Sequence, residues 1–466
     1  MEIPNDIAIL KDIVSKLLSR IEDLEAENAT LKSINADLLS RLNKNSKNSN
    51  KPPSTDGLAK KPAFPQSQGK KTGGQLGHKG KTLEIVSHPD PTIVHHAEFC
   101  PCCSKIFSSD DVEQIVARRQ VFDIPQPRLE VTEHQIGLIT CCQQEHKGSF
   151  PVAVGQQVQY GTKIKALSVL LNTDYKIPFE KISQLLSDLY SCSFNESTAI
   201  SANQACFDAL ETVQESIKSK ILQAQVTHFD ETGMRVEAKL HWFHTASTIL
   251  FTYLFVHAKR GAEALNSSES LIKDFTNWAI HDCWASYFEF KQCAHALCNA
   301  HILRELESLK EGGSKWAIEM QDLLLELFQL SQKATIIVPD KDIWLQKYTQ
   351  ICQNGDQEEP PPAKGKRGKP KSTKGRNLLK RLLLHQQGIL AFAFIEHIPF
   401  TNNQAERDIR CLKTKQKVAT SFRTFNGAKT YARIQSVVST LRKHNMNVFQ
   451  NLIKALDKEQ VEFSYA

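Results

Sequence analysis

Three acidic residues lie where chemistry on a phosphate group would need them. Asp230 follows a β-branched and aromatic run at residues 226–229, Asp282 closes the sequence Trp-Ala-Ile-His-Asp, and Glu406 lies in a stretch with helical periodicity. Hard cations such as Mg²⁺ and Mn²⁺ prefer carboxylate oxygens. Two such ions about 3.5 to 4 Å apart can activate an attacking oxygen and stabilise the leaving one in an in-line displacement at phosphorus. The three acids therefore predict a site for two Mg²⁺ or Mn²⁺ ions.

The segments around the first two acids predict the framework that positions them. Residues 239–247 and 249–257 are rich in aromatic and β-branched side chains and are expected to be strands. A helix is expected over about 260–275, and residues 278–280 form a short buried strand. Three strands, a helix and a strand open a ribonuclease-H-like fold, whose first and fourth strands are parallel neighbours, with the helix as the right-handed crossover. The two aspartates would then lie side by side.

The third acid lies in a predicted helix. Asn402 or Asn403 can serve as its N-cap, and apolar residues recur at spacings of four and three from Ala405 to Leu412. A glutamate on a helix packed over two strand aspartates would complete the set of oxygen ligands.

Four blocks of sequence surround these acids. They are Asp230-Glu-Thr-Gly, His281-Asp-Cys-Trp-Ala-Ser-Tyr, Cys298-Asn-Ala-His-Ile-Leu-Arg-Glu-Leu and Asn402-Asn-Gln-Ala-Glu-Arg-Asp-Ile-Arg, in this order. In these blocks the chain resembles the transposases of the insertion-sequence-66 family, bacterial mobile elements with a DDE catalytic triad. The resemblance implies that the two aspartates and Glu406 are the catalytic acids of a DNA transposase. Such an enzyme would bind its element's ends, hydrolyse the phosphodiester and join the freed 3′-hydroxyl to target DNA.

Two other functions stay open, namely a zipper-type DNA-binding protein without catalysis and a metal-dependent nuclease of the same fold that cuts without joining. Each acid alone also has an ordinary explanation. Asp282 could cap a helix, Glu406 could pair with a nearby arginine, and Asp230, like the glutamate beside it, could be a surface acid at a strand end. Cys298 and His301 precede a helix with Cys-x-x-His spacing. They are expected to pack in the core or to lie near the phosphate, since a metal site would need two more ligands.

Composition limits the class of protein. A chain of 466 residues is expected to form two to four domains. It has no run of 18 apolar residues and no charged-then-apolar start, so neither membrane insertion nor export is expected. We expect a location in a bacterial-type cytosol, close to the nucleoid. Twelve cysteines in such a chain predict reduced thiols, some of them available to zinc, and no disulfide framework.

Two segments are strongly basic. Residues 41–81 carry ten Lys or Arg against one acid, and residues 364–381 carry nine and no acid, so each has a charge of +9 within a chain of +7. They fit a DNA backbone, because neutralising phosphates releases condensed counterions; a solvated linker is the alternative. The side chains expected to contact DNA are Lys51, Lys60, Lys61, Lys70 and Lys71, with Lys413, Lys415, Lys417 and Arg423 following Glu406.

The N-terminal residues follow a heptad repeat. Leucines occupy every seventh position at residues 10, 17, 24, 31 and 38, and mostly β-branched residues or asparagine fill the companion positions from Ile7 to Leu42. This pattern predicts a parallel coiled coil and hence a homodimer. The alternative is an amphipathic helix that folds back on its own chain.

Cysteines after the linker suggest a structural zinc site. Cys100 and Cys103 form a Cys-x-x-Cys pair, and Cys142 with His146 offers a second pair, with the preceding cysteine as a substitute. Two such knuckles would give a tetrahedral zinc site in a small zinc-ribbon-like β module, with strand-like stretches such as residues 129–138 between them. Ordinary reduced cysteines in such a module are the alternative.

Residues 161–225 are predicted to be largely helical. A helix starting at Pro178, a turn at residues 191–195 and a second helix from about Ser197 could form a helix-turn-helix. Residues 303–334 and 377–394 are also expected to be helices, inserted between the second and third acids. We therefore predict a multidomain α+β protein. Its expected parts are a coiled-coil helix at 1–43, a basic linker at 44–90, a zinc-binding-like module at 91–155, a helical, DNA-binding candidate domain at 156–225, a ribonuclease-H-like catalytic domain at 226–450 with a helical insertion at about 300–395, and a tail at 451–466.

Overall fold

The computed structural model describes residues 7–42, 44, 48, 82–333, 338–361 and 372–463. Its centre is a mixed sheet in the order β5-β4-β3-β6-β7. The strands are β3 (Val226–Val236), β4 (Lys239–Ser247), β5 (Thr252–His257), β6 (Trp278–His281) and β7 (Ala294–Leu297). The first three are antiparallel, whereas β6 is parallel to both β3 and β7; the short β8 (Ser421–Phe422) pairs with the far end of β3. The chain is thus a mixed α+β protein, as predicted.

The strand predictions are largely confirmed, but the prediction of a long crossover helix over about 260–275 is wrong. β4 has the predicted bounds, β5 starts three residues later than expected, and β6 extends the predicted strand by one residue at its end. Between β5 and β6 only α6 (Ala262–Leu265) is helical. Asn266 and Ser267 donate side-chain hydrogen bonds to the carbonyls of Ala262 and Ala264. These polar side chains compete for the backbone, which explains why the helix ends early.

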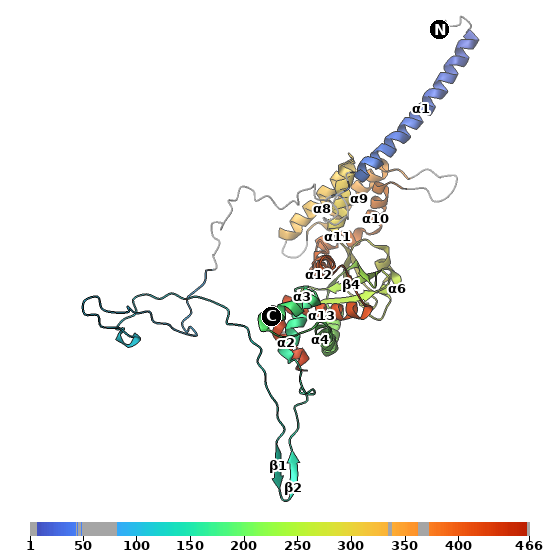
Figure 1. Cartoon of the computed structure of the whole chain (residues 1–466). Coiled ribbons are helices and arrows are strands. Elements are labelled where there is room, and N and C mark those ends of the chain that lie inside the picture. The colour runs from blue at the N-terminus through green and yellow to red at the C-terminus, as the bar shows by residue number, and fades with distance from the viewer. Residues whose placement is uncertain are drawn as a thin grey trace.

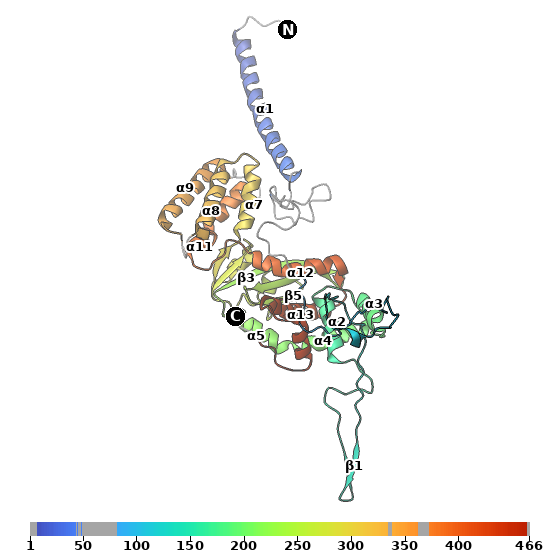
Figure 2. The same ribbon diagram turned by 90° about the vertical axis from the view of Figure 1, so that its left-hand side faces the viewer.

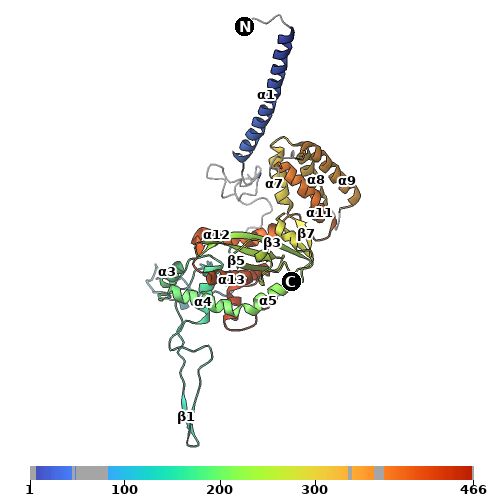
Figure 3. The same ribbon diagram turned by 90° about the vertical axis from the view of Figure 1, so that its right-hand side faces the viewer.

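Helices cover both faces and both edges of the sheet (Figure 3). α12 (Asn403–Ala419) packs on one face and α5 (Glu211–Leu222) on the other. α13 (Phe425–Lys443) lies along the β5 edge, where the hydroxyls of Ser436 and Thr440 accept the backbone N–H groups of Leu254 and Thr252. At the β7 edge α11 (Gln386–Phe394) approaches so closely that a Cβ at Gly388 would lie 2.6 Å from a backbone oxygen of β7.

The helices that precede the sheet share its main hydrophobic core. They are α2 (Thr162–Thr173), α3 (Phe179–Tyr190), α4 (Glu196–Ala209) and α5. Buried residues of α2, α4 and α5 pack with the sheet, with α13 and with α14 (Val448–Leu456), whereas α3 belongs to a smaller cluster around Ile182 and Leu186. The predicted boundary at residue 225 is therefore not a boundary of the core, and the predicted tail begins inside a packed helix.

A group of helices follows β7, as expected of the insertion, and Figure 2 shows it beyond one end of the sheet. It comprises α7 (Asn299–Lys310), α8 (Lys315–Lys333), α9 (Lys341–Glu358), α10 (Lys374–Leu384) and α11, packed in a core of their own against β6 and β7. Half of the second basic segment falls on residues 362–371, outside the described part of the chain. In the described half, Arg376 pairs with Asp356 and Arg381 with Glu305, so these cations are already neutralised.

The N-terminal third is built differently. α1 (Ile7–Leu42) is one continuous helix that projects from the rest of the molecule in Figure 1. Its apolar stripe is exposed, with Leu17 at 56% and Leu24 at 47%, so it is not folded back on its own chain. Residues 82–155 are mostly extended and exposed, with a hairpin of β1 (Leu138–Cys141) and β2 (Gln144–Lys147). The strands expected at 129–138 are absent apart from the start of β1. None of the described helices is long and apolar enough to cross a membrane.

Candidate active site

The two aspartates come from neighbouring parallel strands. The register between β3 and β6 pairs Thr227 with Ala279 and His228 with Ile280. Asp230 and Asp282 each lie two residues beyond that last pair, so the same register sets them level with each other. Because neighbouring parallel strands present level residues on the same side of a sheet, the two carboxylates face a common space.

Glu406 lies on the helix that covers this same face. Alternate residues of a strand share a face, so Asp230 points to the side on which Met234 and Val236 pack against Ile409 of α12. Residues 405, 409 and 412 are buried as the helical pattern predicted. The first turn of α12, with Glu406, lies next to His228 and Phe229 of β3, which the side chain of Asn402 contacts.

Asn402 fixes the start of α12 to the sheet. It is the N-cap residue of the helix, as predicted, but its side chain is 2% exposed and makes no capping hydrogen bond. Instead its Nδ2 donates to the carbonyl of Phe229 at 2.7 Å, its Oδ1 lies 2.9 Å from the Nδ1 of His228, and its backbone N–H donates to the sulfur of Cys298 at 3.1 Å. One side chain thus connects the helix that carries Glu406 to the strand that carries Asp230. Sequence reasoning missed this role, because a cap is the commoner use of an asparagine there.

The acids interact electrostatically. Burial raises the pKa of Asp230 well above its ordinary value, and the charges of Glu231, Asp282 and Glu406 raise it further. Burial and the charge of Glu231 also raise the pKa of Asp282, while His301 opposes the rise. Clustered carboxylates with raised pKa values repel one another until a cation neutralises them. This donor set of partly buried carboxylates fits Mg²⁺ or Mn²⁺.

Glu231 is not a surface acid. It points to the opposite face of β3 from Asp230, and its side chain is only 2% exposed. One carboxylate oxygen accepts two hydrogen bonds from Arg260, at 2.6 and 2.8 Å, and the other accepts the hydroxyl of Tyr287 at 2.6 Å. The guanidinium of Arg260 lies between the rings of Trp242 and Trp284, 4.9 and 4.5 Å from their centroids. This Glu231–Arg260–Tyr287 network supports the segment after Asp282, whose carboxylate accepts the N–H of Trp284 at 3.1 Å.

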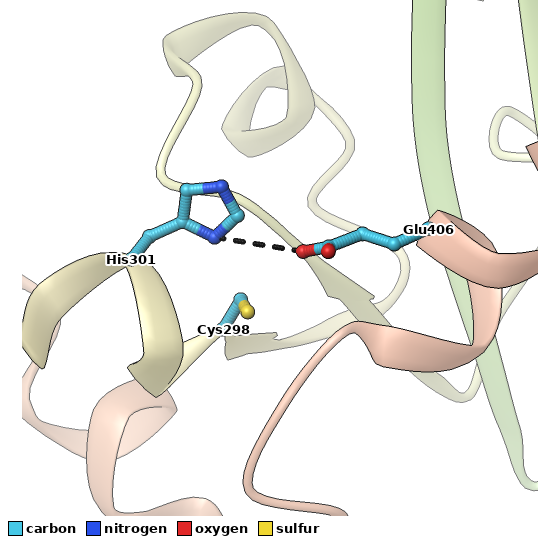
Figure 4. Close-up of side chains that lie close together, drawn as sticks. All are labelled: Cys298, His301 and Glu406. Carbon is cyan, nitrogen blue, oxygen red and sulfur yellow. Dashed lines mark ion pairs between the residues drawn. The ribbon is translucent and has the colours of Figure 1, made fainter. Parts of the chain in front are cut away.

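A second cluster meets Glu406 from the other side. Cys298 and His301, at the start of α7, point toward Glu406 in Figure 4. One ligand atom from each lies within 4.8 Å of the others, and no other group of three or more Cys, His, Asp or Glu in the described residues meets this limit. The ligand atoms of Asp230, Asp282 and Glu406 are therefore not all within 4.8 Å of one another. Burial lowers the pKa of His301, so its imidazole is neutral near pH 7.

Comparison with known families decides the classification. The family model described as Transposase IS66 family matches residues 157–430, more than half of the chain. This chain belongs to the IS66 transposase family. A family of unknown function, DUF6444, matches residues 4–84, which include α1 and the first basic segment. A search of curated proteins finds no match.

The predicted DNA-contacting residues of this IS66-family chain divide into three groups. Lys51, Lys60, Lys61, Lys70 and Lys71 lie outside the described residues. Lys413, Lys417 and Arg423 are exposed on and after α12, and the charge of Asp230 acts on Lys413. Lys415 is a correction, since it is 7% exposed and its ammonium lies 5.7 Å from the ring centroid of Tyr431. Burial lowers its pKa to about 8. It faces the interior because Leu412, three residues earlier, does.

The predicted zinc ligands of the transposase are not brought together. In the first pair, hydrogen bonds from the backbone N–H groups of Cys103 and Cys102 lower the pKa of the Cys100 thiol. Cys142 lies in the turn of the β1–β2 hairpin and His146 on β2. In Figures 1 and 2 this hairpin lies far from the short helix at Ser109–Asp111 that follows the first knuckle.

Proposed function

We propose that this chain is a DNA transposase of the DDE type with a ribonuclease-H-like catalytic domain. Membership of the IS66 transposase family supports a role in moving DNA. The single observation that carries the catalytic assignment is the β3–β6 register, which sets Asp230 level with Asp282 beneath the helix that carries Glu406. The sheet order, with three antiparallel strands followed by two parallel ones, supports the fold.

Asp230, Asp282 and Glu406 would hold two Mg²⁺ or Mn²⁺ ions. These acids do not all bring a ligand atom within 4.8 Å of one another, and two ions about 3.5 to 4 Å apart can bridge more widely placed ligands than one ion can. When bound, the ions activate the attacking oxygen and neutralise the leaving one. The protein orients the acids through Asn402 and the Glu231–Arg260–Tyr287 network. Water would be the first nucleophile and the freed 3′-hydroxyl of the element the second.

Loss of any one acid tests the catalytic assignment. Asp230→Asn, Asp282→Asn and Glu406→Gln remove a charge and keep the shape. Each should reduce cleavage and strand transfer of element-end DNA in Mg²⁺ by about 100-fold or more, since losing about 3 kcal/mol of charge stabilisation has that effect. Asp274→Asn is the control, because that side chain is 61% exposed. Near wild-type activity in all three variants would remove the assignment.

DNA is proposed to run along α12. The exposed cations Lys413, Lys417 and Arg423 follow Glu406 on one side of the predicted active site. Replacing them together by glutamine should weaken binding to DNA ends and lower the salt dependence of that binding by about one unit of slope per lost phosphate contact. A filter-binding series at several salt concentrations measures the slope. A strand-transfer product separates a transposase from a nuclease that only cuts.

The transposase is proposed to form a homodimer through α1. The helix spans 36 residues, and its apolar stripe is exposed at Leu17, Leu24, Leu31 and Leu38. A parallel partner helix would cover this stripe. Leu24→Asp should convert the dimer to a monomer in sedimentation analysis, whereas Glu22→Ala, on a neighbouring position off the stripe, should not. A wild-type chain that sediments as a monomer would exclude the homodimer.

We also propose a structural zinc site formed by the N-terminal cysteines and His146. Cys100 and Cys103 would supply one half of the site, and Cys142 and His146 would have to move to complete it. Zinc content of the purified chain, compared with a Cys100→Ser variant, tests whether the second knuckle joins the first.

A further inference from the structure

We propose that Cys298, His301 and Glu406 form a separate metal site that takes a thiophilic divalent ion of the zinc type and shares Glu406 with the proposed two-ion centre. The sharing of Glu406 rests on the proposed function, whereas the site itself depends only on the three side chains. Sulfur, nitrogen and oxygen donors together select ions such as Zn²⁺ or Co²⁺ and disfavour Mg²⁺.

The positions of the ligand atoms carry the inference. The three ligand atoms lie within 4.8 Å of one another, and the Nδ1 of His301 is 4.0 Å from the Oε1 of Glu406. This separation is too long for a hydrogen bond. A tetrahedral zinc ion with bonds of about 2.0 to 2.3 Å holds its ligands roughly 3.3 to 3.8 Å apart. The 4.0 Å between His301 and Glu406 exceeds this range by a few tenths of an ångström, and separations of up to 4.8 Å exceed it by about 1 Å, so the three side chains would move together by up to about 1 Å to hold the ion.

Two buried polar atoms in this cluster lack partners. Within the described chain, neither the Nδ1 of His301 nor the Oε1 of Glu406 has a hydrogen-bond partner, and both atoms are shielded from solvent. Leaving a buried polar atom unsatisfied costs about 1 to 3 kcal/mol. A neutral imidazole nitrogen and a carboxylate oxygen that face each other without a shared hydrogen bond are an arrangement that a cation between them would stabilise.

The backbone holds the ligands in place. Cys298 is the N-cap of α7, and His301 lies on the first turn of that helix. The backbone N–H of Asn402 donates to the sulfur of Cys298, and Glu406 follows one turn later on α12. Two helix starts, joined by this hydrogen bond, thus present all three donors. The fourth position of a tetrahedral ion is left to water, as in zinc sites that exchange a ligand.

Cobalt spectroscopy of the full-length chain tests the site directly. Co²⁺ substitutes for Zn²⁺, and its thiolate-to-metal charge-transfer absorption reports a bound cysteine. The background chain carries serine at the five exposed or half-exposed N-terminal cysteines, so that the proposed N-terminal zinc site adds no signal; these are Cys100, Cys102, Cys103, Cys141 and Cys142. We expect one Co²⁺ per chain with a charge-transfer band.

Variants of the ligands decide the outcome. Cys298→Ser should abolish the band, and His301→Gln should weaken Co²⁺ binding by more than about 100-fold, beyond the loss that follows removal of an outer-shell partner. Cys206→Ser is the matched control, because that thiol is buried in the main core, away from Glu406. A band that survives Cys298→Ser, or affinity unchanged by His301→Gln, would overturn the site, and circular dichroism verifies that each variant is folded.

Asp230→Asn separates this inference from the proposed function. It should abolish DNA cleavage and leave the cobalt band intact, since Asp230 is not one of the three donors. A chain that binds Co²⁺ through Cys298 but never cleaves DNA would retain the site and lose the proposed function. A chain that cleaves DNA through its acids but shows no cobalt band would retain the proposed function and lose the metal site. If both stand, Zn²⁺ should inhibit Mg²⁺-dependent cleavage, because Zn²⁺ engages Glu406.

Discussion

The transposase presents Cys-x-x-Cys or Cys-x-x-His spacing in two regions, and only one of them gathers a third ligand. Cys298 and His301 start a helix in the packed half of the molecule, and Glu406 reaches them from a segment about a hundred residues away. Cys100 and Cys103 lie on an extended, exposed chain, and Cys142 sits on a separate hairpin. In both regions the spacing along the sequence brings two metal-binding residue types close together. Only in the C-terminal region does the packed fold bring such a pair, Cys298 and His301, close to a third residue, Glu406.

The framework in the C-terminal region consists of buried polar contacts. Asn402 joins α12 to β3 and to Cys298, and Arg260 neutralises Glu231 on the other face. In the described residues of 82–155 the hydrophobic side chains are mostly exposed and no buried residue supports the cysteines. The contrast implies that changes to the framework should be costly in the first region and mild in the second.

Removing Asn402 should give the largest effect. Asn402→Ala leaves the carbonyl of Phe229 and the Nδ1 of His228 without partners in a buried place, and it should lower the free energy of unfolding by about 3 to 5 kcal/mol. DNA cleavage should fall with it, because Glu406 loses its anchor. Urea denaturation measures the first effect. Asn403→Ala, one residue later on the exposed side of the helix, is the control, and equal stability of the two variants would contradict the anchoring role.

Removing Arg260 should give the next largest effect. Arg260→Ala leaves the carboxylate of Glu231 without its cation in a site that is 2% exposed. Loss of one partner of a buried pair costs about 3 to 5 kcal/mol, and we expect about 2 to 3 here because the arginine is 40% exposed. Thermal unfolding in the absence of DNA provides the measurement. Arg235→Ala, at an exposed arginine of the strand β3 that carries Glu231, should change stability by less than about 0.5 kcal/mol.

Asp230→Asn should flatten the pH dependence of stability in metal-free protein. The pKa of Asp230 is raised well above 3.8 by burial and by neighbouring charges. Between about 3.8 and the raised pKa the folded chain keeps a proton that the unfolded chain has released, so the free energy of unfolding falls as pH rises, by up to about 1.4 kcal/mol per pH unit. Asparagine does not titrate and removes this fall. Urea curves collected in EDTA across this range test it, with Asp208→Asn, an exposed acid, as control; curves that run parallel to wild type would refute it.

The N-terminal cysteines should give the smallest effect. In metal-free protein Cys142→Ser and His146→Ala should each change the free energy of unfolding by less than about 0.5 kcal/mol, because both side chains are exposed. If zinc does join the two knuckles, zinc-loaded protein should instead become sensitive to both substitutions. A zinc-dependent rise in melting temperature that Cys142→Ser abolishes would remove the contrast between the two regions.

The arrangement of Asp230 and Asp282 was within reach of the sequence, because strand alternation and strand order are local signals. The partners of Glu231 were not, since adjacent acids on a strand give no sign of which face is buried. Arg260 and Tyr287 reach Glu231 from 29 and 56 residues away, and no spacing in the sequence records such contacts.

Helical elements show the same limit. The bounds of β4 and the start of α3 followed from composition and from Pro178. The prediction of a crossover helix was wrong because the side chains of Asn266 and Ser267 donate hydrogen bonds to carbonyls of the preceding turn. Apolar periodicity does not reveal this competition for the backbone. Lys415 was assigned to DNA because it belongs to a run of lysines, yet its place on the helix turns it inward.

The covered edges of the sheet have a consequence for how this transposase can meet other molecules. Hydroxyls of α13 accept two backbone N–H groups of β5 and α11 lies against β7, so an extended peptide or a second copy meets a helix at either edge of the central sheet. Strand addition at these two edges of the central sheet is thereby disfavoured. Assembly can instead use side chains on helices, and the exposed leucines of α1 offer such a surface.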